Sequence, residues 1–334
     1  MSELRRGIKI AVLLSVVSIV QSYDPPDTLW TSTYDNSEFD DLNSIIQTLD
    51  GGYLLGGCSF HKKPEDWQEY WLIKTDSLGN IMWENTCMDS TIIFSCCNSV
   101  FQNDDGSFIA SGTVDEVGGS DTDIRIVKLD SNGQILLDER IGTDLDNDCY
   151  DMAPTSDGGY VFGATHGVWD YSDFLIIKTD SLLNVEWRKV FGSSGMNWMF
   201  SIIQTSDGGY LAGGSENFNY QTADNYLVKT DADGNLEWTK TWGESYWDKI
   251  EDLLQTPDGG YMVLAALAFN SDYDNEYHHE CRLIKLNENG DIQWETDYHR
   301  NPNSFLETID GGYVITGTYQ HNLWLMRTDS FGNK

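Results

Sequence analysis

The sequence predicts an all-β fold, a six-bladed β-propeller of four-stranded antiparallel blades, and three observations support that prediction. A turn written Asp-Gly-Gly-Tyr recurs along the chain, and a degenerate copy, Asp-Gly-Ser-Phe, fills the one gap in the series. Successive copies are about fifty residues apart, a period that suits a propeller blade and exceeds that of ankyrin or leucine-rich repeats. A tryptophan also recurs at one place in most repeats. The turns begin at Asp50, Asp105, Asp157, Asp207, Asp258 and Asp310.

Each repeat reads as four short strands, called a to d, and the fourth repeat shows them most clearly. Strands a (201–204) and b (209–214) are joined by a tight Asp-Gly-Gly turn, and strands c (225–229) and d (235–241) by a longer hairpin with Gly234. Glycine supplies the positive φ that such turns need, and aspartate bonds the turn backbone. The pattern therefore predicts an antiparallel four-stranded blade.

Two kinds of side chain recur at fixed positions. Strand d carries a tryptophan in four repeats, which we interpret as a wedge between neighbouring sheets rather than a ligand contact, because regular recurrence suits packing. Strand c ends on a basic residue in every repeat. We favour ion pairs between these basic residues and the turn aspartates. The alternative is a cationic ring that binds an anion, which is disfavoured because the third strand of a blade does not line the axis. The residues are Trp83, Trp187, Trp238 and Trp294, and Lys74, Lys128, Lys178, Lys229, Lys285 and Arg327.

The last repeat ends before any strand d, and the missing strand is found near the other end of the chain. Residues 29–34 precede the first strand a as residues 237–242 precede the fifth repeat. We therefore expect this N-terminal strand to complete the last blade beside residues 323–327, which would remove an exposed sheet edge. The competing interpretation is a truncated array of repeats.

Residues 1–22 read as a secretory signal peptide, with basic residues, an apolar run (10–20) and small residues at the predicted cleavage site. A membrane anchor is disfavoured because that run is too short to span a bilayer. Residues 23–334 are expected to form a single propeller domain. The localisation that follows is secreted, extracellular or cell-surface, with the periplasm as the alternative.

The composition excludes some partners. The formal net charge is −34, which disfavours nucleic acid and anionic membrane surfaces. No second run of spanning length follows the signal peptide, so no transmembrane anchor is expected after its cleavage. An aromatic content of 13% argues against disorder. We expect a monomer.

Six cysteines in an exported chain permit disulfides. Cys87 with Cys96 or Cys97 is the expected local bridge, because one excursion between strands holds all three. The alternative is that the cysteines are free and buried.

Antiparallel connectivity assigns the loops to two ends of the strands. The a–b and c–d turns share one end, and the b–c loops and d-to-a connections share the other. The repeats diverge at the second end, here called the irregular-loop face, and a rigid scaffold with irregular loops is the usual setting of a binding site. Its aromatic residues either contact a sugar or protein ligand or cover the core. The candidates are Trp67, Trp169, Tyr171, Trp198, Tyr220, Trp247, Tyr273, Tyr277 and His278.

Two constellations raise the question of metal ions. Asp144, Asp146 and Asp148 alternate in sequence and suggest calcium, although the glycine and glutamate of an EF-hand loop are absent. His278 and His279 are metal-ligand types, but adjacent residues on a strand point to opposite faces, so zinc is disfavoured. No cofactor is required, and calcium is the one considered.

No catalytic residue is assigned. The chain has no Gly-x-Ser-x-Gly elbow, His-Glu-x-x-His helix or phosphate-binding glycine loop. Paired carboxylates such as Asp146 and Asp151 do not stand out from the abundant aspartates. The leading hypothesis is a binding module for protein or polysaccharide. The alternatives are a glycoside hydrolase or lyase with an axial site, and a purely structural surface protein.

The repeat consensus resembles that of a known family. Asp-Gly-Gly-Tyr, an apolar-Lys-Thr-Asp strand end and Gly-Asn-x-x-Trp resemble the β-propeller repeats of exported bacterial and archaeal proteins, and are similar to SBBP-type (seven-bladed) repeats. The likeness runs from Trp30 to Asn333. The chain departs from it in having six units and in a second unit that has Leu137 in place of the tryptophan. The resemblance implies an architecture and a secreted or surface location rather than an activity.

Overall fold

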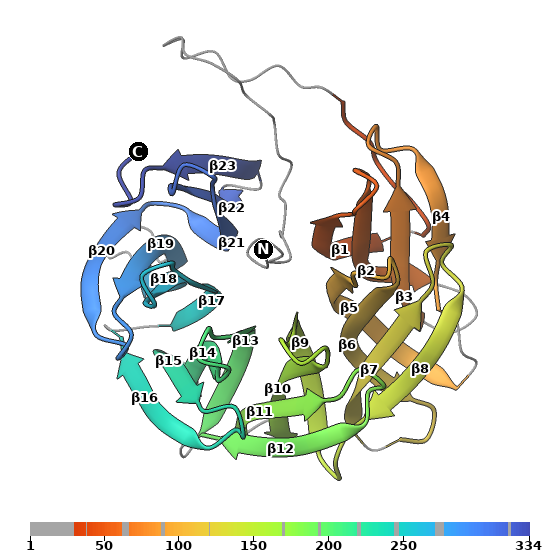
Figure 1. The fold of residues 1–334 in the computed structure, drawn as a ribbon, viewed down its shortest axis with the longest axis horizontal. Coiled ribbons are helices and arrows are strands. Elements are labelled where there is room, and N and C mark those ends of the chain that lie inside the picture. The colour runs from red at the N-terminus through yellow and green to blue at the C-terminus, as the bar shows by residue number, and fades with distance from the viewer. Residues whose placement is uncertain are drawn as a thin grey trace. The chain divides into compact units, whose positions relative to one another are not determined.

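The computed structural model shows an all-β chain whose strands form antiparallel sheets, with no helix among the described residues (Figure 1). The structure describes residues 30–37, 39–61, 67–87, 91–119, 121–168, 171–192, 195–218, 222–243, 247–270, 277–319 and 322–334.

The strands of the first two repeats are β1 (Phe39–Gln47), β2 (Tyr53–His61), β3 (Trp67–Thr75), β4 (Ile81–Asn85), β5 (Ile92–Gln102), β6 (Phe108–Glu116), β7 (Thr122–Leu129) and β8 (Ile135–Ile141). The next two hold β9 (Asp146–Pro154), β10 (Tyr160–Val168), β11 (Tyr171–Thr179), β12 (Val185–Phe191), β13 (Met196–Gln204), β14 (Tyr210–Phe218), β15 (Asp224–Thr230) and β16 (Leu236–Trp242). The last two hold β17 (Asp248–Gln255), β18 (Tyr261–Asn270), β19 (Tyr277–Leu286), β20 (Ile292–Tyr298), β21 (Asn301–Glu307), β22 (Tyr313–Tyr319) and β23 (Asn322–Thr328).

The chain divides into two compact units. The first comprises Met1–Ala110, Val114–Gly118 and Ile126–Asp138, and the second comprises Ser111–Thr113, Gly119–Arg125 and Glu139–Lys334. Each unit has its own buried clusters, such as the one around Leu54, Leu72 and Phe108 in the first and the one around Leu227, Ile250 and Val263 in the second.

The repeating element is a four-stranded antiparallel meander, which gives the chain a β-propeller-like fold. In the second unit, strands β9, β13 and β17 lie on the inner side of their sheets, and β12, β16 and β20 lie on the outer side (Figure 1). Neighbouring meanders meet through a short parallel bridge, as at Ser172 and Met196. The four-stranded blade expected from the sequence is thus confirmed as the repeating unit.

The predicted pairing of residues 29–34 with β23 is not confirmed. Residues 30–35 form no strand, and among the described residues the last sheet has the order β21-β22-β23. Trp30 instead packs on Tyr53, with ring centroids 5.8 Å apart, and the Tyr34 hydroxyl donates to the Gly79 carbonyl at 2.8 Å. Leu29 lies outside the described residues.

The recurring tryptophans are wedges between sheets, as predicted. Trp187 packs edge-on against Tyr210 of the next repeat, with centroids 5.5 Å apart. The same ring lies over the c–d turn of that repeat, where a Cβ placed on Gly234 would be 2.8 Å from the indole. Glycine is needed here both for this contact and for its φ of 74°.

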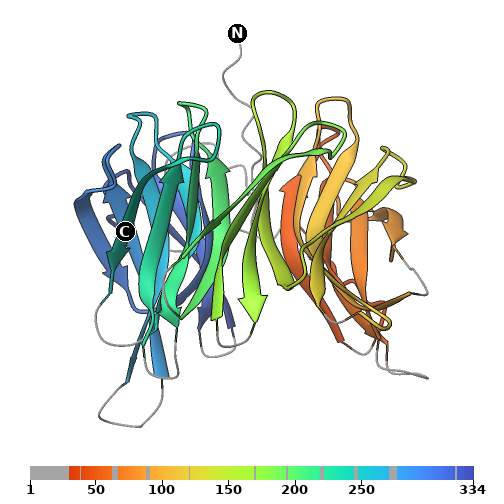
Figure 2. The same cartoon turned by 90° about the horizontal axis from the view of Figure 1, so that it is seen from below.

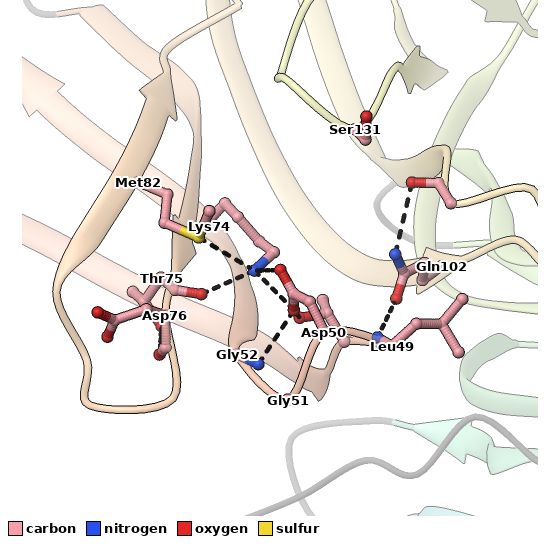
Figure 3. Close-up of polar contacts among 12 residues, drawn as sticks. Leu49, Asp50, Gly51, Gly52, Lys74, Thr75, Asp76, Met82, Gln102 and Ser131 are labelled. Atoms are coloured by element: carbon pink, nitrogen blue, oxygen red, sulfur yellow. Dashed lines mark hydrogen bonds and ion pairs between the residues drawn. The ribbon is translucent and has the colours of Figure 1, made fainter.

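Five of the six basic residues that end strand c form the ion pairs favoured from the sequence, and Figure 3 shows the first of these pairs. The Lys74 ammonium lies 2.8 Å from a carboxylate oxygen of Asp50 and donates to the carbonyl of Thr75 at 2.7 Å. The same aspartate accepts the amide of Gly52 at 3.0 Å, so one side chain ties the a–b turn to the end of strand c. Related pairs are Lys178 with Asp157, Lys229 with Asp207, Lys285 with Asp258 and Arg327 with Asp310.

Glutamine side chains join successive repeats at the same end of the strands, a contact that was not predicted from the sequence. The side-chain oxygen of Gln102 accepts the Leu49 amide of the preceding a–b turn at 2.7 Å (Figure 3). Gln204 and Gln255 accept the amides of Ser156 and Ser206 in the same way.

The expected bridge from Cys87 is wrong, because the disulfide joins Cys58 of β2 to Cys96 of β5. Successive side chains of a strand point to opposite faces, so Cys96 and Cys97 cannot both face β2. Cys97 instead belongs to the buried cluster that also holds Cys87, and both cysteines lie outside the disulfide. The bridge ties the first repeat to the second within the first unit.

Among the described residues, no helix is long and apolar enough to cross a membrane.

Candidate functional site

The two ends of the strands differ in what their residues do. In the second unit, the turns seen together at one end of the strands in Figure 2 are the regular hairpins, closed by bonds such as Gly208 N–H to the Thr205 carbonyl. The aspartates, lysines and glycines that recur at these hairpins hold the strands of each blade together. A site that distinguishes one repeat from another therefore belongs at the irregular-loop face.

A cavity of about 340 Å³ opens at that face in the third repeat. It lies among the ends of β10, β11 and β12 and the connections that lead into β9 and β13. Its apolar part includes an exposed tyrosine ring and three partly exposed aliphatic side chains, and its polar part includes a histidine and an aspartate. The residues are Tyr171, Leu145, Val168, Val190, His166 and Asp173.

The two polar side chains stand side by side because of strand register. His166 of β10 pairs directly with Asp173 of β11, so both side chains project from the same face of the sheet. Directly opposite residues in an antiparallel pair have their Cβ atoms about 5 Å apart. The cavity therefore presents an imidazole and a carboxylate next to each other.

A fully buried asparagine holds each of these polar groups. Nδ1 of His166 lies 3.1 Å from Oδ1 of Asn147, whose amide nitrogen donates to Thr143 Oγ1 at 3.2 Å. Asp173 Oδ1 accepts from Nδ2 of Asn197 at 3.0 Å, and this nitrogen also donates to the Ser172 carbonyl at 2.9 Å. Because both asparagines are fixed by packing and by backbone contacts, the polar wall of the cavity is pre-organised.

The fourth repeat has a different residue at one of these two positions. The strand register places Glu216 and Asp224 where the third repeat has His166 and Asp173. The aspartate thus recurs with the fold, packed against a glycine of the d-to-a connection in both repeats. The histidine does not recur. The third repeat therefore differs from its neighbour at a residue that lines the cavity.

A second group of side chains lies along the inner strands of the second unit, and Trp198 is the one member that the sequence analysis had named. Phe200 of β13 packs edge-on against Tyr150 of β9, with centroids 5.3 Å apart, and against Trp198 at 6.4 Å. The Lys249 ammonium lies 4.8 Å from the Phe200 centroid and 2.8 Å from a carboxylate oxygen of Glu251. The signal available in the sequence was the alternation of these residues with buried ones along each strand a.

Burial raises the pKa of two acidic side chains on these inner strands. It raises the pKa of Asp148, against a lowering hydrogen bond from Thr122, and the charge of Asp146 adds to the rise. It also raises the pKa of Glu251, which the nearby Lys249 partly offsets. Such shifts accompany functional sites but also structural ion pairs, and the Lys249–Glu251 contact is of the second kind.

Asp151, considered from the sequence as one of a pair of carboxylates with Asp146, bonds to the neighbouring repeat. Asp151 is buried, and its Oδ2 accepts the amide of Ile202 at 3.1 Å and the hydroxyl of Ser201 at 3.3 Å. Its oxygens therefore join two neighbouring repeats. In the same way, Oδ2 of Asp252 accepts hydrogen bonds from the hydroxyl of Ser304 and the amide of Phe305.

The nine candidate residues of the irregular-loop face differ in exposure and in whether the structure describes them. Tyr171 has 68% of its surface exposed and lines the cavity, whereas Trp198 and Trp247 are half-buried. Trp67 begins β3, and Tyr277 and His278 begin β19, with side chains outside the described set. Trp169, Tyr220 and Tyr273 lie outside the described residues.

The aspartates proposed for calcium lie before and on β9. Asp144 is exposed, Asp146 accepts the amide of Thr122 at 3.1 Å, and Asp148 accepts the hydroxyl of the same threonine at 3.0 Å. Within the described ranges, no three or more histidine, cysteine or acidic side chains are grouped to hold a metal ion. The calcium hypothesis stays a prediction for titration.

Comparison with known proteins gives no family. No protein-family model matches the chain, so the resemblance to seven-bladed repeats is not confirmed, and no curated protein matches its sequence. Among solved structures, Sqt1 from Chaetomium thermophilum is 14% identical with a TM-score of 0.49, covering 87% of this chain and 72% of that one.

Two further solved structures are similar at the same level. BamB from Moraxella catarrhalis is 11% identical with a TM-score of 0.46, covering 82% of this chain and 78% of its own. An endo-arabinase from Bacteroides thetaiotaomicron is 11% identical with a TM-score of 0.39, covering 69% and 92%. We draw no function from likenesses of this size.

Proposed function

We propose that this protein is an exported binding module that contacts a protein or a polysaccharide through its irregular-loop face. The observation that carries the proposal is the cavity between Tyr171 and the His166–Asp173 pair, whose polar wall is held by two buried asparagines. An exposed ring beside fixed hydrogen-bonding groups is the usual composition of a recognition site.

Export is supported by the signal-peptide pattern and by the Cys58–Cys96 disulfide, since disulfides persist in oxidising compartments. The strongly negative charge favours neutral or cationic partners over nucleic acid. A ring of six blades completed by residues 29–34 remains our proposal for the whole chain, supported by the repeats and by β23, which is the last strand of its sheet among the described residues.

The test is a binding screen of the whole protein against immobilised polysaccharides and purified surface proteins. We expect Tyr171→Ala combined with Trp247→Ala to lose the detected ligand. Phe331→Ala is the matched control, because Phe331 is as exposed as Tyr171 (68% each) but lies at a c–d turn. Loss in the control and retention in the double variant would refute the assignment of the face.

The carbohydrate-active alternative has its own readout. A panel of chromogenic glycosides is incubated with the wild type and with Asp148→Asn, which removes the acid whose pKa burial raises. Turnover that disappears in this variant would replace the binding-only proposal with an enzyme of the inner strands.

A further inference from the structure

We infer that the cavity of the third repeat binds one residue of a neutral carbohydrate, with the sugar ring against Tyr171 and its hydroxyl groups on His166 and Asp173. This inference rests on the proposed function and names the class of ligand.

The walls match the two-sided chemistry of a sugar. A pyranose has an apolar face of C–H groups, which suits the negative face of an aromatic ring, and a polar edge of hydroxyl groups. Tyr171 exposes 68% of its surface, and Val168 and Val190 expose about half of theirs beside it. A cavity of about 340 Å³ is near the lower limit for small-molecule sites, so it accommodates a single residue rather than a long segment.

The polar groups offer complementary hydrogen bonds. Nδ1 of His166 is engaged by Asn147 and Thr143, which leaves Nε2 as the ring nitrogen for a ligand. One oxygen of Asp173 accepts from Asn197, and its carboxylate has further acceptor positions. Adjacent sugar hydroxyls both donate and accept, so neighbouring imidazole and carboxylate groups suit them.

Charge selects the neutral class. The formal net charge is −34, and the polar wall itself contains a carboxylate. An anionic ligand such as a uronic acid would be repelled both at long range and within the site. A neutral glycan meets no such penalty.

The experiment is a titration of the whole protein with cellohexaose, xylohexaose and mannohexaose, with polygalacturonate as the anionic counterpart. Binding is followed by calorimetry and by the imidazole NMR signals of His166, assigned with His166→Gln. We expect at least one neutral oligosaccharide to shift the His166 signals, and Tyr171→Ala to weaken its binding about tenfold, the equivalent of one stacking contact. Tyr171→Phe should retain binding, and so should Phe331→Ala.

The outcomes separate this inference from the proposed function. If no neutral oligosaccharide binds while Tyr171→Ala abolishes binding of a protein partner, the carbohydrate inference is wrong and the binding face stands. Sugar binding that survives Tyr171→Ala but is lost in Trp247→Ala would overturn the assigned cavity alone. Stronger binding of polygalacturonate than of the neutral glycans would overturn the charge argument and with it the ligand class. Loss of binding only in Phe331→Ala would refute both proposals.

Discussion

At the scale of single residues, the basic residues of strand c show how one side chain organises a blade. Lys229 is almost wholly buried, yet its ammonium reaches Asp207, Glu237 and the Thr230 carbonyl, each at 2.9 Å. A buried ammonium is stable only when its donors are satisfied, and here all three are engaged. The lysine therefore links the two hairpin turns of the regular end to the start of strand d.

Removing this buried lysine should cost more than removing its exposed counterpart. We expect Lys229→Met to lower the free energy of unfolding by about 2–3 kcal/mol, because three contacts are lost and the turn carboxylate loses its partner. Arg327→Met is the control, since Arg327 pairs with Asp310 in the equivalent place but is largely exposed and should cost less than about 1 kcal/mol. Equal losses in urea unfolding would show that burial is not the source of the effect.

The turn aspartates should make the protein sensitive to acid. Partial burial alone would raise the pKa of Asp157, but hydrogen bonds from Thr155, Lys178 and Gly159 outweigh it and lower this pKa to about 2. The contribution to stability is complete above the unfolded-state pKa of about 4 and is lost as the pH falls through 2. Asp258 behaves in the same way, led by the hydrogen bond from Thr256. We expect Asp157→Asn to reduce the loss of melting temperature between these two pH values, and an unchanged slope would contradict the argument.

At the scale of strands and sheets, the repeated features were predictable and the single ones were not. The Asp-Gly-Gly turns, the wedges and the strand c ion pairs occur in several copies, so their spacing identified them and packing could be argued from recurrence. The Asn147–His166 contact occurs once. It depends on the register between β9 and β10, which cannot be read from the sequence. The cavity was therefore anticipated only through Tyr171.

The disulfide is a second single feature, and it should stabilise the first unit. Cys58 and Cys96 are 38 residues apart, and a loop of that length corresponds to about 3–4 kcal/mol of lost unfolded-state entropy. We expect dithiothreitol to lower the melting temperature of the wild type. The double variant Cys58→Ala, Cys96→Ala should begin at the lower temperature and be insensitive to the reductant. A reductant effect that persists in this variant would point to a different bridge.

Strand β23 exposes leucine side chains that the proposed closing strand, residues 29–34, would lie beside. Leu323 and Leu325 are 88% and 55% exposed, whereas Leu227, which strand register makes the equivalent of Leu325, is fully buried in the cluster that it shares with Ile250 and Val263 of the next repeat. If residues 29–34 pair there, deleting residues 23–35 should lower the melting temperature by more than Trp30→Ala, which removes only the wedge. Equal effects of the two changes would refute strand pairing.

At the scale of the whole molecule, the net charge of −34 opposes folding, because acids far outnumber the bases that could pair with them. The Debye length falls from about 30 Å at 0.01 M to about 10 Å at 0.1 M salt, so repulsion between surface acids is screened over that range while the buried lysine pairs are affected little. We expect the melting temperature to rise with sodium chloride and then level off.

Calcium chloride at matched ionic strength should give the same rise if screening is the only effect. A larger rise that disappears with Asp144→Asn and Asp146→Asn would establish calcium binding, whereas a melting temperature that falls with salt would show that attractive surface pairs outweigh the repulsion.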